Sequence, residues 1–542
     1  MEKYWHWIDE TVENIIEYWK DQDRYVCSCG MSVSGLQHIG RLRGEIILTN
    51  TVKEELLRIG KDAEHFLVLY TQDQWKGKGA QLEQFSNQEK AQEYRSRRLI
   101  DVPDPLGCHK NWVEHYWGPF RDSLSSFSIG VKPVFTTDLY KTEGMKELVK
   151  KAIHKKEQLR KIINKYRGRN PYSEGWIPFE PLCKECLTIG QHEILSVDLD
   201  NYTVEYVCNR CGTKGVSSME DGKLNWRIEW AALWTLLDVN FEPYGKDHAT
   251  PGGSRDSCAE IIEKIFERKP PFGFSYEWIG WSVDGKDMGD MGSSDFLGVT
   301  PAEWLEISEP EVLRYLYLKN KPMKRVVIDL SRVPELAEAY DQVERVYYGV
   351  ETVPQEKEGF EMRRSYELSQ LKPPPKALPF QLRYAHAVTL VQTLPKENLL
   401  ENAITKLKTT GLLRDKPSKN DRIRIEKRLV EAEAWLEKYA PERFKLKILE
   451  ELPANLKKQI KEEEKEALRI FADKLGNIEL TEDELENLLY RVAKDESGLG
   501  SRKFFQLIYL VLFGQKQGPR LASFILLVDR NMLLQRLRDA YQ

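Results

Sequence analysis

The sequence predicts a multidomain protein in which an α/β domain, split by a metal-binding insertion, precedes an all-helical region. Three observations lead to this prediction: a strand, turn, helix and strand pattern near the N-terminus, two Cys-x-x-Cys pairs, and long helical periods after about residue 325. At 542 residues the chain is too long for one compact core. Several domains are therefore expected.

The first α/β unit lies between about residues 24 and 100. Tyr25-Val26-Cys27 is predicted to be a strand that enters a Ser/Gly turn, an apolar-periodic helix follows, and residues 65–70 (HFLVLY) have the pattern of a buried strand. This is one βαβ unit of a parallel sheet. Strand and glycine patterning resumes near residue 240, after the cysteine region, so an insertion is predicted to split the domain.

The C-terminal part has the pattern of amphipathic helices. The apolar positions Leu456, Ile460, Ala467, Ile470 and Leu475 recur at helical spacing, and the charge run at 461–466 is typical of the solvated face of one helix. A proline-rich linker lies at 372–376. The predicted division is 1–100 and 221–325 for two halves of the α/β domain, 101–220 for the insertion, and 326–542 for the helical region.

Composition excludes some classes of protein and leaves others open. The formal net charge of −4 neither supports nor excludes contact with nucleic acid, which would need local basic patches. The N-terminus has no apolar run of signal-peptide type, and we find no stretch of about 18 apolar residues. Eight cysteines are too sparse for a disulfide scaffold in a chain of this length. A cytoplasmic protein without membrane spans is predicted.

The motif at residues 34–41 has the features of a phosphate-binding turn. Ser34-Gly35-Leu36-Gln37-His38-Ile39-Gly40-Arg41 follows the first strand and opens an amphipathic helix. The N-terminus of a helix offers unpaired N–H groups and a positive dipole end, and His38 can donate to phosphate oxygens. A histidine beside a packing glycine gives the same pattern without a ligand, so the motif alone leaves both interpretations open.

Cys183, Cys186, Cys208 and Cys211 form two Cys-x-x-Cys pairs with the spacing of a four-cysteine zinc site. The β-like stretch at 202–207 can bring the two loops together. Four thiolates leave no open position, so the predicted zinc is structural rather than catalytic. Two disulfides or four free thiols are the alternatives.

A third motif joins Gly245-Lys246-Asp247-His248 to a glycine-rich turn at 252–256. A carboxylate after a strand can accept hydrogen bonds from ribose hydroxyls, and glycines leave room for a nucleotide. Asp247 is therefore a candidate for binding a sugar. An ordinary Asx turn with a surface acid is the alternative.

The resemblance to a known family rests on these motifs taken in order. Residues 34–41 resemble the HIGH signature of class I aminoacyl-tRNA synthetases, with Arg41 in place of the last histidine, and the lead-in at 30–35 (GMSVSG) is similar to that of class I lysyl-tRNA synthetases of the archaeal type. The likeness extends to residues 102–109 (VPDPLGCH), 241–248 (FEPYGKDH), 276–278 (YEW) and 518–524 (GPRLASF). These blocks follow the order of the family over most of the chain.

The resemblance implies a Rossmann-type catalytic domain with a zinc-binding insertion near the transfer-RNA acceptor stem, followed by an all-α anticodon-binding region. It implies ATP-dependent attachment of L-lysine to tRNA(Lys) through a lysyl-adenylate, with ATP, Mg²⁺ and a structural Zn²⁺, and a monomer is expected. The implied catalytic residues are His38, Gly40, Arg41, Lys286, Ser293 and Ser294. The implied ATP contacts are Ser34, Gly35, His38, Gly40, Asp247 and Met291, and the implied lysine contacts are Gly30, Ser32, Trp230, His248 and Tyr276.

The loop at 284–295 departs from the family pattern in its charge. Aligned to the Lys-Met-Ser-Lys-Ser-type signature, Asp290 and Asp295 replace both lysines, while Met291, Ser293 and Ser294 keep the pattern. The segment holds four Asp and one Lys, so its net charge is 1 − 4 = −3. That charge should repel departing pyrophosphate and slow activation. The compensations considered are Lys286, Arg41, Arg255 and an additional Mg²⁺ recruited by the aspartates.

The altered loop also keeps an alternative open. A relative of the synthetases that binds transfer RNA or an aminoacyl-adenylate, with weak or no activation, would show the same loop. Retention of His38, Gly40, Asp247, His248 and the zinc cysteines favours the enzyme.

Overall fold

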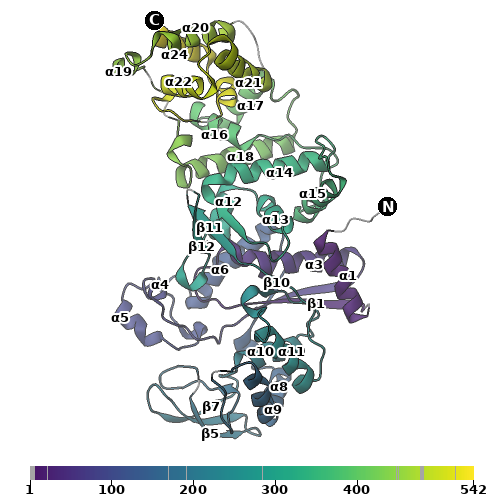
Figure 1. Cartoon of the computed structure of the whole chain (residues 1–542). Coiled ribbons are helices and arrows are strands. Elements are labelled where there is room, and N and C mark those ends of the chain that lie inside the picture. Colours follow the sequence, from purple (N-terminus) through teal and green to yellow (C-terminus); the bar gives the residue numbers. More distant parts are fainter. Residues whose placement is uncertain are drawn as a thin grey trace.

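The computed structural model describes residues 6–20, 22–168, 170–190, 192–283, 285–446, 449, 451–476, 481–518 and 520–542. Asp284, Pro519 and the first five residues, on which the sequence analysis drew, lie outside these ranges. The molecule is elongated, with β5 (Glu193–Asp198) and β7 (Lys214–Ser218) at one end and the C-terminal helices at the other (Figure 1). No helix in the described ranges combines the length and the apolar character needed to cross a membrane.

A parallel sheet forms the centre of the N-terminal part. β1 (Arg24–Met31) pairs in parallel with β2 (Asp62–Leu69), and β2 pairs in parallel with β3 (Lys132–Phe135). Nearly every residue of β1 is buried, as expected for a strand covered on both faces. β1 is longer than the strand predicted at Tyr25-Val26-Cys27. Residues 28–31 have the composition of a turn, but they pair with β2 and extend the strand to Met31.

The second half of the chain completes this sheet on the other side of β1. Phe241 forms parallel bridges with Cys27 and with Phe272. The backbone N–H groups of Asn240 and Phe241 donate to the Val26 carbonyl at 2.8 and 3.1 Å. β9 (Tyr244–Gly245) and β10 (Ser275–Tyr276) continue the same two segments as a parallel pair. The order of strands thus reverses between β1 and the segment at 240, which is the switch point where doubly wound sheets bind ligands.

Helices cover both faces of the sheet. The N-terminal half contributes helices whose bounds are α1 (Trp7–Trp19), α2 (Ile39–Arg41), η1 (Leu42–Leu48), α3 (Thr49–Arg58), α4 (Gly79–Leu82), α5 (Gln88–Ala91) and α6 (Trp112–Leu124). The second half contributes α10 (Trp226–Leu236), α11 (Ser254–Ile261), α12 (Pro301–Ile307) and α13 (Pro310–Leu318). α1, α2, α3, α6, α12 and α13 share one continuous apolar core with the sheet.

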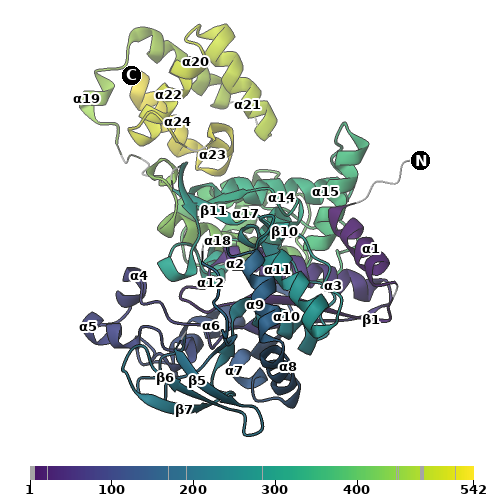
Figure 2. The same ribbon diagram turned by 60° about the horizontal axis from the view of Figure 1, so that its bottom comes forward.

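The insertion begins later in the chain than the sequence suggested. β3 and α6 fall within the range 101–220, yet β3 belongs to the central sheet and α6 packs into its core. The inserted part proper carries α7 (Thr136–Leu139), α8 (Glu143–His154), α9 (Lys156–Lys165), and two antiparallel sheets made of β4 (Phe179–Glu180), β8 (Lys223–Leu224), β5 (Glu193–Asp198), β6 (Thr203–Val207) and β7 (Lys214–Ser218). β5, β6 and β7 lie together at the far edge of the molecule (Figure 2).

The helical region starts at α14 rather than at residue 326. Val326–Asp329 forms β13, which pairs in parallel with β11 (Ile279–Val283), and β11 pairs antiparallel with β12 (Lys286–Asp290). Helices follow, with the bounds α14 (Val333–Tyr347), α15 (Glu356–Ser369), α16 (Tyr384–Thr393), α17 (Leu399–Thr409), α18 (Lys419–Lys438), α19 (Ala454–Lys457), α20 (Glu462–Gly476), α21 (Glu482–Arg491), α22 (Ser501–Phe513), α23 (Leu521–Leu527) and α24 (Arg530–Tyr541).

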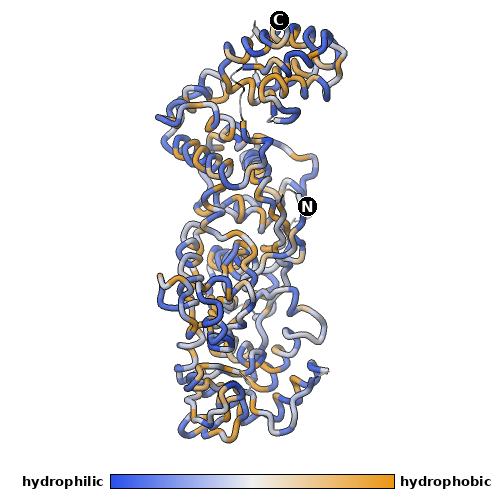
Figure 3. The backbone as a smooth tube through the Cα atoms, turned by 90° about the vertical axis from the view of Figure 1, so that its left-hand side faces the viewer, coloured by the Kyte–Doolittle hydropathy of each residue, from blue (hydrophilic) through white to orange (hydrophobic). Residues whose placement is uncertain are grey.

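The last five helices, α20 to α24, enclose an apolar core of their own. Hydrophilic and hydrophobic stretches alternate along them, as amphipathic helices require (Figure 3). The predicted helical period is confirmed for Ala467 and Leu475, which are buried in α20. Leu456 and Ile460 lie before α20, because the chain interrupts the helix between α19 and Glu462. The charge run predicted at 461–466 is solvated, with half-buried to exposed side chains.

A buried arginine joins the helical region to the α/β part of the chain. Arg428, 3% exposed, contacts Glu309 at 2.9 Å and Asp341 at 3.2 Å, and donates to the Leu382 carbonyl at 3.1 Å. These partners come from the turn before α13, from α14 and from the segment before α16. Removing the arginine would leave two carboxylates without their partner in an apolar interior.

We predict that Arg428→Met lowers the free energy of unfolding by about 3 to 5 kcal/mol, the usual cost of breaking a buried ion pair. Arg422→Met is the matched control, because Arg422 lies on the same helix and forms an exposed pair with Glu401 that should be worth about 0 to 1 kcal/mol. Urea unfolding followed by circular dichroism measures both. Equal losses in the two variants would contradict the prediction.

Candidate active site

A cavity of about 1180 Å³ opens at the carboxyl ends of β1 and β2, beside the switch point. Its walls come from both halves of the parallel sheet, from the insertion through Glu180 and Lys223, and from the loop after β12. Polar side chains and glycines predominate among the lining residues. A cavity of this size and position can hold a nucleotide together with a second small molecule.

Most of the residues singled out from the sequence line this one cavity. They are Gly30, Ser32, Ser34, His38, Gly40, Arg41, Trp230, Asp247, His248, Tyr276, Met291, Ser293 and Ser294. Gly35 and Lys286 are not among the described residues that line it. A Cβ on Gly35 would lie 2.4 Å from the Ser293 carbonyl oxygen, so Gly35 packs against the loop instead. Lys286 is exposed at the start of β12.

His38 stands at the start of α2 and is buried, with 6% of its surface exposed. Burial, reinforced by the positive charge of Arg41, lowers its pKa to about 3. The ring is therefore neutral at physiological pH, and its Nδ1 has no hydrogen-bond partner among the described residues. A neutral imidazole with an uncommitted nitrogen can hydrogen-bond a ligand oxygen without adding a formal charge.

The backbone around His38 differs from the predicted helix N-terminus. α2 is only three residues long and continues as a π-helix, and the N–H of Ile39 donates to the Val299 carbonyl at 2.7 Å. That N–H is already used within the fold, so contacts to a phosphate must come mainly from side chains. Gly40 remains essential to the geometry, because a Cβ there would lie 2.8 Å from His38 Nδ1.

An aromatic subsite forms between the two halves of the sheet. The Trp230 indole N–H donates to Glu242 at 2.6 Å, which fixes the ring, and the Trp230 and His248 ring centroids lie 5.2 Å apart. Burial raises the pKa of Tyr276 and lowers the pKa of His248. The negative charge of Glu45 acts to raise both pKa values. A cation with a hydrocarbon stem would find aromatic faces and a carboxylate here.

The three described aspartates of the loop are each paired with a cation from another segment. Arg325 contacts Asp287 at 2.6 Å and Asp290 at 3.3 Å, and a hydrogen bond from Arg325 lowers the pKa of Asp287 to about 2. Lys246 lies 3.8 Å from Asp290, and Lys78 lies 3.0 Å from Asp295. The negative charges of Asp287, Asp290 and Asp295 are therefore partnered by cations in the folded chain.

The cations that do this were not those proposed from the sequence. Arg255 is buried and stacks over Trp234 at 4.4 Å, outside the lining of the cavity. Arg41 does reach the loop, with its Nε 3.3 Å from Ser293 Oγ, and also pairs with Glu45 at 2.8 Å. The contacts of Asp290 and Asp295 with cations remove the reason for these aspartates to recruit an additional Mg²⁺.

A buried lysine in the cavity wall was also missed. Lys223 Nζ lies 2.6 Å from Asp73 and 3.0 Å from Glu229, and only 4% of the residue is exposed. Burial opposes its charge, but the two carboxylates raise its pKa above the ordinary value. Burial also raises the pKa of the neighbouring Glu180 to about 7. These groups fix β4 and β8 of the insertion against the end of β2, so the insertion forms part of the cavity.

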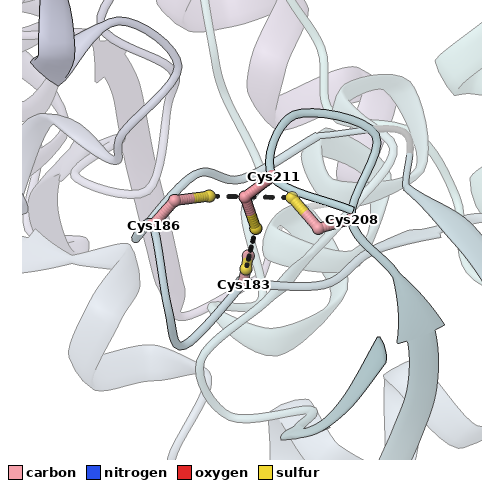
Figure 4. A group of neighbouring side chains, drawn as sticks. All are labelled: Cys183, Cys186, Cys208 and Cys211. Atoms are coloured by element: carbon pink, nitrogen blue, oxygen red, sulfur yellow. Dashed lines mark hydrogen bonds between the residues drawn. The ribbon is translucent and has the colours of Figure 1, made fainter. Parts of the chain in front are cut away.

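The four cysteines of the insertion face one another (Figure 4). Their Sγ atoms lie 3.7 Å apart for Cys183 and Cys211 and 3.6 Å apart for Cys186 and Cys208. Four thiolates around a tetrahedral zinc at Zn–S distances of about 2.3 Å would lie about 3.8 Å apart, whereas a disulfide requires about 2.05 Å. The donor set and spacing fit a closed four-thiolate metal site.

A second group of four side chains of the metal-ligand type lies at residues 104–115, where the sequence analysis assigned no site. Cys108 Sγ lies 3.0 Å from His109 Nδ1 and 3.3 Å from His115 Nδ1, and His115 Nδ1 lies 2.9 Å from Asp104. The N–H of Leu106 donates to the same carboxylate at 2.9 Å and orients it. The pattern Asp-x₃-Cys-His-x₅-His in the sequence could have indicated this group.

The chain is similar in sequence to known tRNA synthetases over most of its length. The family described as tRNA synthetases class I (K) matches residues 5–372, and an anticodon binding domain matches residues 421–541. The lysine–tRNA ligase of Aeropyrum pernix is 41% identical over 541 residues, which are 99% of this chain and 98% of that protein. Those of Methanosphaera stadtmanae and Pyrococcus horikoshii are each 32% identical, over 98% of this chain and 99% of those proteins.

The lowered pKa values of three buried histidines predict how the stability of the fold depends on pH. Burial lowers the pKa of His6 to about 4 and of His38 and His65 to about 3. Below about pH 6.5 the unfolded chain binds protons that the folded chain cannot, so their contribution to stability is present above pH 6.5 and is lost as the pH falls. From pH 6.5 to 5.0 each histidine should cost about 2 kcal/mol.

Replacing His38 with Gln should therefore make the pH dependence of unfolding shallower than in the parent chain over this interval. Urea midpoints measured at several pH values between 5.0 and 6.5 give the two slopes, and carboxylates common to both proteins cancel in the comparison. Parallel slopes would show that His38 takes up its proton in the folded state as readily as in the unfolded state.

Proposed function

Since the chain belongs to the lysine-specific class I tRNA synthetases and attaches lysine to transfer RNA, we propose that the cavity at the switch point is its active site. The observation that carries this proposal is the convergence of thirteen residues, singled out from the sequence for ATP and lysine chemistry, on one cavity. Lysine would be activated there as lysyl-adenylate and then transferred to the terminal adenosine of the transfer RNA.

We place the lysine substrate in the aromatic subsite. Trp230, His248 and Tyr276 offer apolar faces to the four-carbon stem, and Glu45 supplies the carboxylate that an ammonium group requires. Gly30 and Ser32 at the end of β1 would meet the α-amino and α-carboxylate groups. A Cβ on Gly30 would lie 2.6 Å from the Tyr70 ring, so only glycine leaves this approach open.

ATP would lie between the two signatures. Asp247 would accept hydrogen bonds from the ribose hydroxyls, Met291 and Gly40 would border the base and sugar, and Ser34 and His38 would face the phosphates. Gly35 supports this arrangement indirectly by packing on the loop. The lysine carboxylate attacks the α-phosphorus in line, so the residues act by positioning the reactants and stabilising charge on the leaving pyrophosphate.

The class uses ATP with Mg²⁺, which neutralises phosphate charge when it is bound. His38 adds a neutral donor, Arg41 a fixed positive charge, and Ser293 and Ser294 two hydroxyl donors. Lys286 is exposed at the start of β12, so we assign it no contact with ATP. The burial of Trp230, Glu242 and Tyr276 keeps water from the lysine side of the reaction.

For the partners, we propose tRNA(Lys) as the nucleic-acid substrate and a monomer as the functional unit. The match of residues 421–541 to an anticodon-binding family supports contact between the C-terminal helices and the anticodon. The proposed division of the chain changes the ranges given above in two places. The second catalytic half extends through β13, because this strand pairs with β11. β3 counts with the first half for the same reason.

The test of the active-site assignment is lysine-dependent exchange of pyrophosphate into ATP, followed by charging of tRNA(Lys). His38→Ala should lower the exchange rate by about 30- to 1000-fold at saturating substrates, which corresponds to about 2 to 4 kcal/mol of transition-state stabilisation, as for other preorganised donors. The KM for lysine should stay within about twofold, because His38 contacts the phosphates rather than lysine. His154→Ala, on the exposed end of α8, is the matched control. An unaltered rate in His38→Ala would remove this residue from the mechanism.

We also propose that both four-ligand sets bind Zn²⁺, one at Cys183, Cys186, Cys208 and Cys211 and one at Asp104, Cys108, His109 and His115. Soft thiolates together with imidazoles favour zinc over Mg²⁺, and four protein ligands make each site structural. The first site would order the strands of the insertion, and the second would hold residues 104–109 against α6. Because cysteines must be reduced to bind zinc, these sites support a reducing, cytoplasmic setting.

The purified chain should therefore contain two equivalents of zinc by plasma mass spectrometry. Cys208→Ser and Cys108→Ser should each lose one equivalent and keep the other, because the sets are separate in sequence and share no ligand. Cys258→Ser should keep both, since Cys258 belongs to neither set. Limited proteolysis should cut the insertion faster in Cys208→Ser. A chain with one zinc that Cys108→Ser leaves in place would disprove the second site alone.

A further inference from the structure

Lys78 brings a positive charge to the loop in which aspartates replace the signature lysines. Its Nζ lies 2.8 Å from Ser294 Oγ and 3.0 Å from each carboxylate oxygen of Asp295. Asp295 aligns with the second lysine of the family signature. The positive charge that this position lacks is therefore supplied by a residue 217 positions earlier in the chain.

A buried glutamine holds the backbone of Lys78 against the first signature. The N–H of Lys78 donates to Gln81 Oε1 at 2.8 Å, and Gln81 Nε2 donates to the Ser34 carbonyl at 2.7 Å. Gln81 lines the cavity but is only 1% exposed. Since both ends of its amide are bonded, Gln81 fixes the position of Lys78 relative to the turn that precedes His38.

The loop turn η7 (Ser293–Asp295) meets a second cation at its other serine. Arg41 Nε lies 3.3 Å from Ser293 Oγ, so adjacent serines each contact a cation from a different element. Arg41, Ser293, Ser294 and Asp295 line the cavity. Lys78 is not among the lining residues, but unlike Lys286 it contacts two residues that are, Ser294 and Asp295. A ligand with several phosphate oxygens would find two cations and two hydroxyl groups here, which is the donor set that polyphosphates require.

Stability does not account for the pair of Lys78 and Asp295. The two side chains are 41% and 49% exposed, and ion pairs so open to solvent contribute little to folding. Asp295 can therefore be exchanged for a more highly charged partner at small cost. A phosphate group beside the turn is such a partner.

We propose that Lys78 is a catalytic residue that binds the β- and γ-phosphates of ATP and the charge of the departing pyrophosphate, while Asp295 holds its ammonium group until ATP arrives. The substrate carboxylate forms a bond to the α-phosphorus, the bond from this phosphorus to the α,β-bridging oxygen breaks, and its electron pair leaves with pyrophosphate. Lys78 makes no covalent bond. The inference rests on the proposed placement of ATP between the two signatures.

The test compares Lys78→Met with the parent enzyme in lysine-dependent pyrophosphate exchange. The variant should show a rate lower by about 100-fold or more, as for other lost stabilisers of leaving-group charge. Its KM for inorganic pyrophosphate should rise by about 10-fold or more, because one charge-assisted contact is lost. The KM for lysine should remain within about twofold, because the lysine subsite lies at Trp230 and Tyr276. Lys78→Arg should restore most of the rate.

Two further variants separate catalysis from a structural role. Lys90→Met, which removes an exposed lysine from nearby α5, should match the parent in every constant. Asp295→Asn should increase the exchange rate, because it frees the ammonium group of Lys78 while leaving its backbone held by Gln81. If the pair were purely structural, Lys78→Met and Asp295→Asn would lower the exchange rate equally. The double variant, which carries both changes, would then lose no more than either single variant.

An unchanged KM for pyrophosphate in Lys78→Met would overturn the inference, and so would the structural pattern of the double-variant comparison. Failure of the proposed active site has a different signature. In that case His38→Ala would keep the parent exchange rate, whatever the result for Lys78→Met.

Discussion

The pairing of β1 with the segment at 240–242 is the constraint on which the rest of this molecule depends. The Asn240 side chain accepts from the Val26 N–H at 2.7 Å, and the Ser28 N–H donates to the Phe241 carbonyl at 2.8 Å. More than two hundred residues separate these partners, and the insertion occupies much of the interval. If this pairing did not form, Trp230, Asp247 and Tyr276 would not share a cavity with His38, because they belong to the other half of the sheet.

Local pattern was sufficient to predict what depends on short stretches of chain. His38 and Gly40 stand at a strand-to-helix turn, and the two cysteine pairs carry their spacing within each loop, so their positions in the cavity and in the cysteine cluster could be predicted from the order of residues alone. The pairing of β3 with β2 was not predicted, for a related reason. A short strand with exposed residues at its start has little periodicity, and its place in the sheet follows from pairing with β2.

Charge balance could not be predicted in the same way. The net charge of −3 in the loop is correct as a count of residues, but Lys78, Lys246 and Arg325 reach these aspartates from three other segments. No spacing in the sequence relates residue 78 to residue 295. Likewise the carboxylates around Lys223 come from the segment after β2 and from α10, so their interaction exists only after the sheet and the insertion have assembled.

Two glycines that pack against tyrosine rings of the cavity have a consequence for how this chain tolerates mutation. A Cβ at Gly44 would lie 2.2 Å from the Tyr276 ring, and one at Gly30 would lie 2.6 Å from Tyr70. The Tyr70 and Tyr276 rings thus occupy space that a side chain at Gly30 or Gly44 would need. A single added methyl group at either position would occupy space that the aromatic rings already fill, so the smallest possible change in side chain becomes one of the most disruptive. Tolerance to substitution in this enzyme should follow the free volume beside each backbone atom rather than the chemical similarity of the residues exchanged.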